Sequence, residues 1–139
     1  MPMSRYDDIV PLMRSLAPES RLTPLQEAEV VSLKAKYPQL PADYVDYLQQ
    51  IGWGGIGNSF YMIYSGLIEA SEIYGAEASK DLGSILFFGD NFSGYCAGFD
   101  TRRGYAVIEI DPVDWRRIEA GGSFEEFIKS VFRRCIANE

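Results

Sequence analysis

The chain has 139 residues, of which 47% are hydrophobic and 14% aromatic. This length predicts one domain with its own core, and the composition argues against a disordered chain. The 20 acidic and 13 basic residues give a formal net charge of −7, which disfavours a general nucleic-acid binder because negative surfaces repel phosphate groups.

The N-terminal segment 1–6 lacks the apolar stretch of a signal peptide, and no apolar run has membrane-spanning length. Cys96 falls in a predicted strand, and Cys135 falls on the apolar face of a predicted helix. Buried, reduced thiols are usual at such positions, although a disulfide between them stays open. We therefore expect a cytoplasmic protein that does not bind membranes.

Residues 1–139 are expected to form one domain, in which 1–22 could be a helical extension. Within that extension, residues 7–16 could form a helix that Pro11 weakens.

A stronger helix start follows at Thr23, which suits an N-cap position. Pro24 then fits the first helical position, and Gln26 would complete a capping box. We expect this helix to end near Tyr37, because Pro38 comes next.

A short amphipathic helix is expected from Leu40 to Ile51, with apolar residues at helical spacing on one side. Gly52 can take the left-handed conformation that ends a helix. The segment Gly52–Gly57 matches the letters of the dinucleotide motif G-x-G-x-x-G. That motif must follow a strand and open a helix. Here it follows a helix, so we predict a helix end and a turn.

The middle of the chain changes to strand periodicity. A strand is expected at 60–64, and residues 66–68 continue it or pair with it. Residues 85–88 are apolar on both faces, as in a central strand. Residues 95–99 and 105–110 flank a short glycine-ended loop, which indicates a hairpin.

The last predicted element is a helix that begins after Ser123, with Glu126 completing a capping box. Its apolar stripe consists of Phe124, Phe127, Ile128, Val131, Phe132, Cys135 and Ile136. The order of elements predicts an α+β fold. It would have N-terminal helices, a central, largely antiparallel sheet of about five or six strands, and a C-terminal helix packed on the sheet.

The chain has no histidine, which excludes histidine-dependent triads and histidine metal sites within it. The two cysteines are too far apart in sequence for a zinc cluster. We expect neither a metal nor a cofactor. A carboxylate-only hydrolase built on Glu109 and Asp111 stays an alternative, because glycosidases and some nucleases need only acidic residues.

Residues 90–94 (Asp-Asn-Phe-Ser-Gly) superficially suggest a calcium loop, but they lack the ligand spacing that such loops require. Aspartate and asparagine before glycine more often build the turn itself. We therefore predict a structural turn. The three Arg-Arg doublets are interpreted as solvated charges or as ion-pair partners for the acidic excess.

Several segments of the chain follow one another in a recognisable order. They are the helix from Leu40 to Leu48, the glycines of Gly52–Gly57, the strand and turn of Ile85–Asn91, the hairpin with Val107, and the motif Ser123-Phe124-x-x-Phe127. Together they resemble the SUKH superfamily, the Smi/Knr-like proteins, over most of the chain. Phe92 departs from the family pattern.

This resemblance implies an α+β domain that binds other proteins and has no catalytic residues. Bacterial members commonly neutralise secreted toxins, often nucleases, whereas fungal members resemble scaffolds that regulate cell-wall synthesis. The present chain, which has only the domain, resembles the bacterial type.

We therefore expect a non-enzymatic protein-binding domain, a bacterial immunity protein that neutralises a basic toxin domain such as a nuclease. An acidic surface would speed association with such a partner. The candidate contact residues are Trp53, Asp90, Asn91, Glu109, Asp111, Asp114 and Trp115. For Trp53, packing over the helix end is the favoured alternative. Besides the hydrolase, a small-ligand or scaffold module stays open, and so does the oligomeric state.

Overall fold

The fold is built on a seven-stranded sheet in which every strand pairs antiparallel with the next strand along the chain. The computed structural model describes residues 5–16 and 20–137, without the side chains of Ala78 and Ser79. The strands are β1 (Arg21–Thr23), β2 (Trp53–Ile56), β3 (Tyr61–Glu69), β4 (Ile85–Asp90), β5 (Cys96–Asp100), β6 (Ala106–Ile110) and β7 (Arg117–Glu119).

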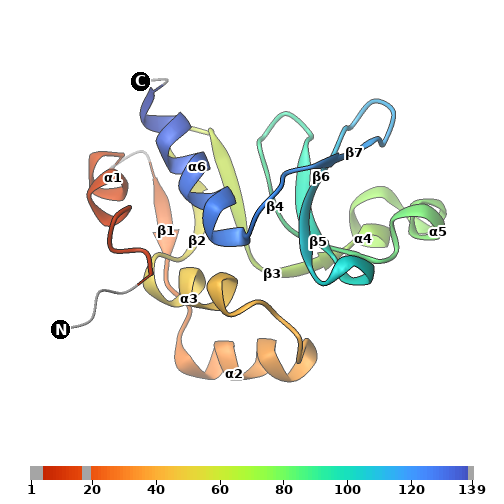
Figure 1. Ribbon diagram of the computed structural model, residues 1–139, viewed down its shortest axis with the longest axis horizontal. Helices are drawn as coiled ribbons and strands as arrows, with labels where there is room; N and C mark the ends of the chain where they lie inside the picture. The colour runs from red at the N-terminus through yellow and green to blue at the C-terminus, as the bar shows by residue number, and fades with distance from the viewer. Residues whose placement is uncertain (1–4, 17–19, 138–139) are drawn as a thin grey trace.

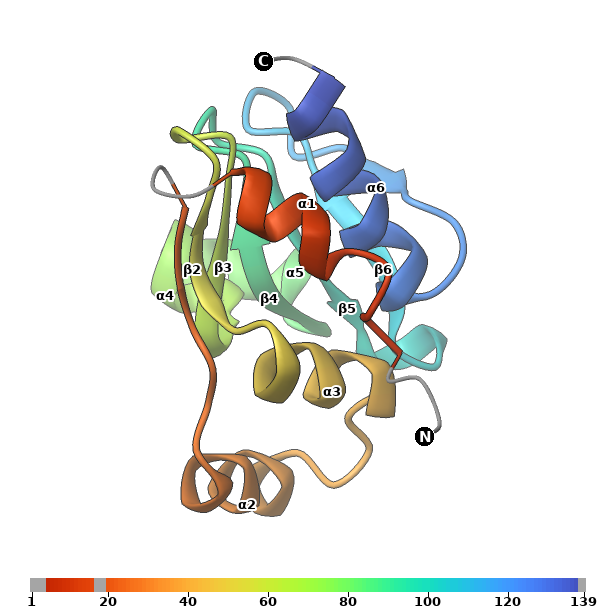
Figure 2. The ribbon, with the colours of Figure 1, turned by 90° about the vertical axis from the view of Figure 1, so that its left-hand side faces the viewer.

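Helices cover both faces of this sheet. They are α1 (Val10–Ser15), α2 (Glu27–Lys36), α3 (Ala42–Gln50), α4 (Ala70–Tyr74), α5 (Ser79–Leu82) and α6 (Phe124–Ala137), with single 3₁₀ turns at Ala76–Ala78 and Thr101–Arg103. In Figures 1 and 2, α1, α3 and α6 lie on one face and α4 and α5 on the other. The prediction of an α+β fold with a C-terminal helix on the sheet is confirmed, with seven strands instead of five or six.

The two faces carry separate core clusters. The larger cluster joins the sheet to α1, α3 and α6 and contains Cys135. The smaller cluster joins the sheet to α4 and α5 and contains Cys96. Both thiols are buried, as expected, and they lie in different clusters rather than in a disulfide.

Aromatic rings form the centre of the larger cluster. Phe88 of β4 lies with its ring centroid 5.0 Å from that of Phe99 and 5.0 Å from that of Phe124. Tyr44 of α3 contacts the same group, 5.1 Å from Phe124. These rings are less than 3% exposed, so they fix α3 and α6 against the sheet through burial and ring packing.

The N-terminal segment contributes to this core as well. Tyr6, Ile9 and Leu16 are fully buried in the larger cluster. Pro11 lies in the first turn of α1. N–H groups there have no partner within the helix, so the N–H that proline lacks costs no hydrogen bond and the helix is not weakened. Within the described residues, the expected extension 1–22 supplies α1 and the start of β1; residues 1–4 and 17–19 lie outside the described ranges.

The prediction of Thr23 as a helix cap is wrong. Thr23 ends β1, where it pairs with Trp53, and α2 begins three residues later than expected. Gln26 is the N-cap instead, and its backbone N–H donates to Glu29 Oε1 at 3.1 Å. The capping box therefore exists one turn further on, because pairing with β2 takes Thr23 into the sheet.

The glycine-rich segment after α3 forms a strand rather than the predicted turn. Gly52 has φ +119° and ends α3 as expected. Gly54 then lies in β2 with φ +126°, and a Cβ at this position would be 1.8 Å from the carbonyl oxygen of Arg21. Only glycine permits β1 to approach so closely.

The other main predictions agree with the structure. Helix α3 lies within the expected range, β4 is the central strand, and β5 and β6 form the expected hairpin. At the start of α6, Ser123 Oγ accepts the Glu126 N–H at 3.2 Å. These elements depend on local capping and periodicity, which the sequence displays directly.

Candidate functional site

One end of the sheet gathers three connections. Because neighbouring strands are antiparallel, β2, β4 and β6 run in the same direction and finish at the same end. The segments that follow them are 57–60, 91–95 and 111–116, and they lie along the upper edge in Figure 1. We call these three segments the loop end.

The segment 91–95 is held by its own side chains. Asp90 Oδ1 accepts the Phe92 N–H at 2.8 Å. Asn91 Oδ1 accepts the N–H groups of Ser93 and Tyr95 at 2.9 and 3.1 Å. The predicted structural turn is therefore confirmed. Phe92 sits at its tip with φ +65° and is 48% exposed.

The segment 111–116 is organised by Asp111. Its Oδ1 accepts a hydrogen bond from the Val113 N–H at 2.8 Å. Its Oδ2 accepts one from the Tyr95 hydroxyl at 3.2 Å and lies 3.6 Å from the Arg116 guanidinium. The Val113 hydrogen bond is the main cause that lowers the pKa of Asp111 from its ordinary 3.8. The Tyr95 bond also ties this loop to the neighbouring turn.

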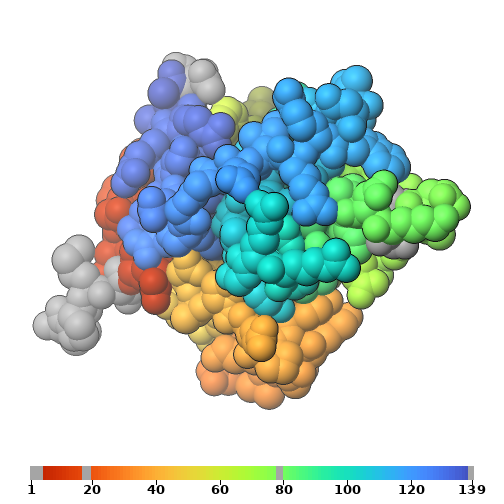
Figure 3. Space-filling model, turned by 45° about the vertical axis from the view of Figure 1, so that its right-hand side comes forward, coloured from red at the N-terminus to blue at the C-terminus, as the bar shows by residue number. Residues whose placement is uncertain are grey.

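Two apolar side chains project from that loop. Val113 is 90% exposed, and Trp115 is 39% exposed. Trp115 has φ +58°, and its ring centroid lies 5.4 Å from that of Tyr74. The tryptophan therefore packs on one side against α4 while the rest of its surface stays open. Figure 3 shows its loop in blue beside the green helix α4 and the segment that follows it.

Exposed apolar groups and unusual backbone coincide at the loop end. Of the four large hydrophobic side chains exposed in the described residues, three lie here: Phe92, Val113 and Trp115. Of the four non-glycine residues with positive φ in those ranges, three lie here: Ser59, Phe92 and Trp115. Such conformations cost on the order of 1–3 kcal/mol each and cluster at functional sites. Exposed apolar groups that gather in one region, rather than singly, likewise mark binding surfaces.

A cleft of about 400 Å³ runs beside Val113 and Trp115. Its walls also include Asp81, Leu82, Asp114 and Arg117. The Arg117 guanidinium donates to Asp100 Oδ2 at 3.2 Å, so its charge is compensated. Two exposed carboxylates, those of Asp81 and Asp114, thus border this cleft beside the apolar side chains of Val113 and Trp115.

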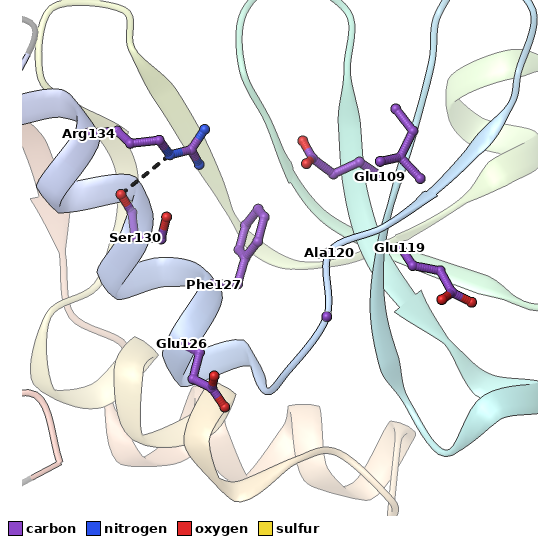
Figure 4. Close-up of a pocket in the computed structure, with 9 residues that line it drawn as sticks. Glu109, Glu119, Ala120, Glu126, Phe127, Ser130 and Arg134 are labelled. Atoms are coloured by element: carbon purple, nitrogen blue, oxygen red, sulfur yellow. Dashed lines mark hydrogen bonds between the residues drawn. The ribbon is translucent and has the colours of Figure 1, made fainter.

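A second hollow lies on the opposite face of the sheet, between α6 and strands β6 and β7 (Figure 4). It measures about 580 Å³. Glu109 of β6 and Arg134 of α6 extend towards each other across it, and Phe127 lies below them. Burial raises the pKa of Glu109 from its ordinary 4.5, although the charge of Arg134 acts against the shift.

Glu109 and Asp111, the pair expected of a carboxylate hydrolase, have different surroundings. Glu109 lines the hollow under α6, whereas the carboxylate of Asp111 is engaged by its own loop. Burial raises the pKa of Glu109, and hydrogen bonding lowers that of Asp111. The arrangement that would support a catalytic pair, one pocket holding both with raised pKa values, is not found for these two described residues.

The structure brings together five of the seven predicted contact residues. Those at or bordering the loop end are Asp90, Asn91, Asp111, Asp114 and Trp115. Glu109 lies in the hollow under α6. Trp53 lies apart in β2, half-buried against the larger core cluster, which agrees with the packing role favoured for it.

Sequence reasoning missed Val113 and assigned no contact to Phe92. Both are apolar residues set among turn-forming residues, in Asp-Pro-Val-Asp-Trp and Asp-Asn-Phe-Ser-Gly. A large apolar side chain inside a strong turn signal is a useful sign of exposure, because the turn lies at the surface.

Comparison with known proteins finds no matching family model and no significant match to a curated protein. Within residues 5–16 and 20–137, no cluster of three or more potential ligands could hold a metal ion. None of the helices in these ranges combines the length and apolar character that crossing a bilayer demands.

Proposed function

We propose that this chain is a non-enzymatic protein-binding domain that acts as a bacterial immunity protein and neutralises a basic toxin domain. One observation carries the binding role: exposed apolar side chains stand on rigid, hydrogen-bonded loops at one end of the sheet. The toxin-neutralising role rests on the resemblance to the SUKH superfamily described above.

The loop end has the physical properties of an interface centre. A tryptophan with an apolar neighbour in a cleft is typical of the residues that supply most binding energy. The side-chain hydrogen bonds of Asp90, Asn91 and Asp111 hold the loops before binding. Little conformational entropy then has to be lost when the partner docks.

Charge supports a basic partner. The chain carries a net charge of −7, and the exposed carboxylates of Asp81 and Asp114 border the cleft beside Trp115. Negative potential would attract a positively charged protein and raise its association rate at low salt. A basic nuclease domain fits this description.

Val113→Lys is the variant that tests this proposal. We expect it to raise the Kd for a basic toxin domain that the unchanged protein binds at least ~30-fold, as for a hot-spot residue worth about 2 kcal/mol. Lysine would place a positive charge and a polar end where a basic partner buries the valine. The measurement is titration calorimetry at two salt concentrations, together with survival of toxin-exposed cells.

Val31→Lys is the matched control. Val31 is also an exposed valine, 60% exposed on α2, so the same substitution adds the same charge far from the loop end. We expect this variant to bind the toxin domain as the unchanged protein does. Equal affinities for both variants would contradict the proposed surface, and no binding of the unchanged protein would contradict the proposed function.

A further inference from the structure

We infer that the outer edge of β7 is a self-association surface, which pairs antiparallel with the same edge of a second copy of this chain. This surface follows the loop end in the chain, and its role does not depend on the proposed function. β7 is the last strand of the sheet, and β6 is its one partner among the described strands. The other side of β7 is therefore an open edge, which is a template for pairing with a further strand. Figure 3 shows the blue segment that contains β7 at the surface.

Arg117 and Glu119 carry the main-chain groups that point out of this edge. Ala120 lies directly after β7, and its N–H donates to the Val107 carbonyl of β6 at 3.2 Å. Bonded and non-bonded pairs alternate along an antiparallel ladder. Ile118 is in phase with Ala120, so its main chain also bonds to β6. The N–H and C=O groups of Arg117 and Glu119 therefore face the opposite way, where a second strand would meet them.

The sequence Arg-Ile-Glu of β7 is complementary to its own antiparallel copy. When the pairing centres on Ile118, Arg117 of each chain lies opposite Glu119 of the other. These opposite charges favour the pairing, and each such pair exchanges both of its main-chain hydrogen bonds. A shift of the register would place Arg117 opposite Arg117, or Glu119 opposite Glu119, and like charges directly opposite are destabilising. The strand therefore favours one register with a second copy, related by a two-fold axis.

The side chains of this edge already make ion pairs, and the pairing extends these ion pairs without breaking them. Arg103 Nη1 donates to Glu119 Oε1 at 2.7 Å. Arg117 donates to Asp100 Oδ2 at 3.2 Å and to the Asp81 carbonyl at 2.6 Å. A carboxylate has a second oxygen and a guanidinium has five donors, so Glu119 and Arg117 retain capacity for each other across the axis. Exposed ion pairs contribute little affinity; here they select the register.

Ile118 supplies an apolar contact at the centre of the pairing. Its side chain is half-buried and lines the hollow under α6. Side chains are closest in a non-bonded antiparallel pair, so the two Ile118 side chains would cover each other on that face of the joined sheet. A single short strand from each chain buries far less than the about 1,200 Å² of a stable complex. We therefore expect a weak dimer that forms only at high protein concentration.

Sedimentation velocity between about 10 µM and about 1 mM protein tests this surface, with an expected dimer Kd on the order of 0.1 mM. Glu119→Pro removes an outward N–H and leaves the bonds to β6 in place, so it should raise this Kd at least ~10-fold. Glu119→Arg sets arginines opposite each other and should have the same effect. Glu27→Arg is the matched control: it makes the same charge change at an exposed position on α2, remote from β7 in Figure 1, and should dimerise as the unchanged chain does.

Hydrogen exchange followed by NMR locates the pairing in the unchanged chain. The amides of Arg117 and Glu119 should exchange about 3-fold more slowly at ~1 mM than at ~50 µM protein, because the dimer population rises. The Ile118 amide, which bonds to β6, should be slower than both at either concentration. A monomer at ~1 mM, a dimer that survives Glu119→Pro, or slowing at Arg117 and Glu119 that needs a basic toxin domain would each overturn the inference.

Discussion

Phe88→Ala is expected to lower the free energy of unfolding by about 3–5 kcal/mol, which corresponds to a fall in Tm on the order of 10–20 °C. Phe88 is fully buried, and its ring lies against Tyr44, Phe99, Phe124 and Phe127. Removing it leaves a cavity where α3 and α6 meet the sheet. Urea denaturation followed by tryptophan fluorescence measures the loss.

Phe92→Ala is the control for this prediction. Its ring is 48% exposed at the tip of a turn, so its removal should change the free energy of unfolding by less than ~0.5 kcal/mol. If the alanine variant at position 88 does not fold, Phe88→Leu supplies a smaller deletion at the same site. Similar stability for the variants at positions 88 and 92 would contradict the described core.

Gly54→Ala is expected to destabilise the protein by roughly 2–4 kcal/mol. Alanine would have to adopt a φ of +126°, and its Cβ would lie 1.8 Å from the Arg21 carbonyl oxygen. Strand β1 would have to move away, which breaks its pairing with β2. Hydrogen exchange of the amides in β1 and β2 should accelerate along with the fall in Tm.

Gly55→Ala is the matched control for that substitution. Gly55 is the next residue of the same strand, and a Cβ there would meet nothing within 4 Å. We expect a change in unfolding free energy within ~0.5 kcal/mol. A loss at position 55 as large as that at position 54 would show that β1 does not approach β2 as described.

The contrast between β2 and α6 shows what sequence could predict. Helix α6 carries its cap at Ser123 and its apolar stripe in consecutive turns, so local rules suffice. The glycines at 52–57 look like a turn locally, because two of the four residues of β2 are glycines and too few side chains remain to show a strand period. They form a strand only because β1, some thirty residues earlier in the chain, pairs with them. The same distant pairing removed Thr23 from the predicted helix start.

The candidate site likewise contains features set by local sequence and features set by distant strand pairing. The turn at Asp90 and Asn91 could be predicted, since its hydrogen bonds are made within a few residues. The meeting of that turn with the loop of Val113 and Trp115 depends on strand order, which periodicity does not encode. Glu109 and Asp111, the pair of the alternative hydrolase, are two residues apart and would share a face if the strand included both. Asp111 instead lies past the end of β6, where its loop engages it.

The core supplies stability, whereas the loop end contains strained backbone. The rings around Phe88 stabilise the sheet from one side. The free energy that they contribute offsets the strain of the left-handed backbone at Phe92 and Trp115. Proteins commonly give up stability at binding surfaces in this way.

The decisive measurement is hydrogen exchange of the chain with and without the proposed toxin partner. We expect slower exchange in segments 57–60, 91–95 and 111–116 of the complex, with α2 and β1 unchanged. Protection confined to α2 or to the β1 edge, with the three loops exchanging as in the unbound chain, would contradict it.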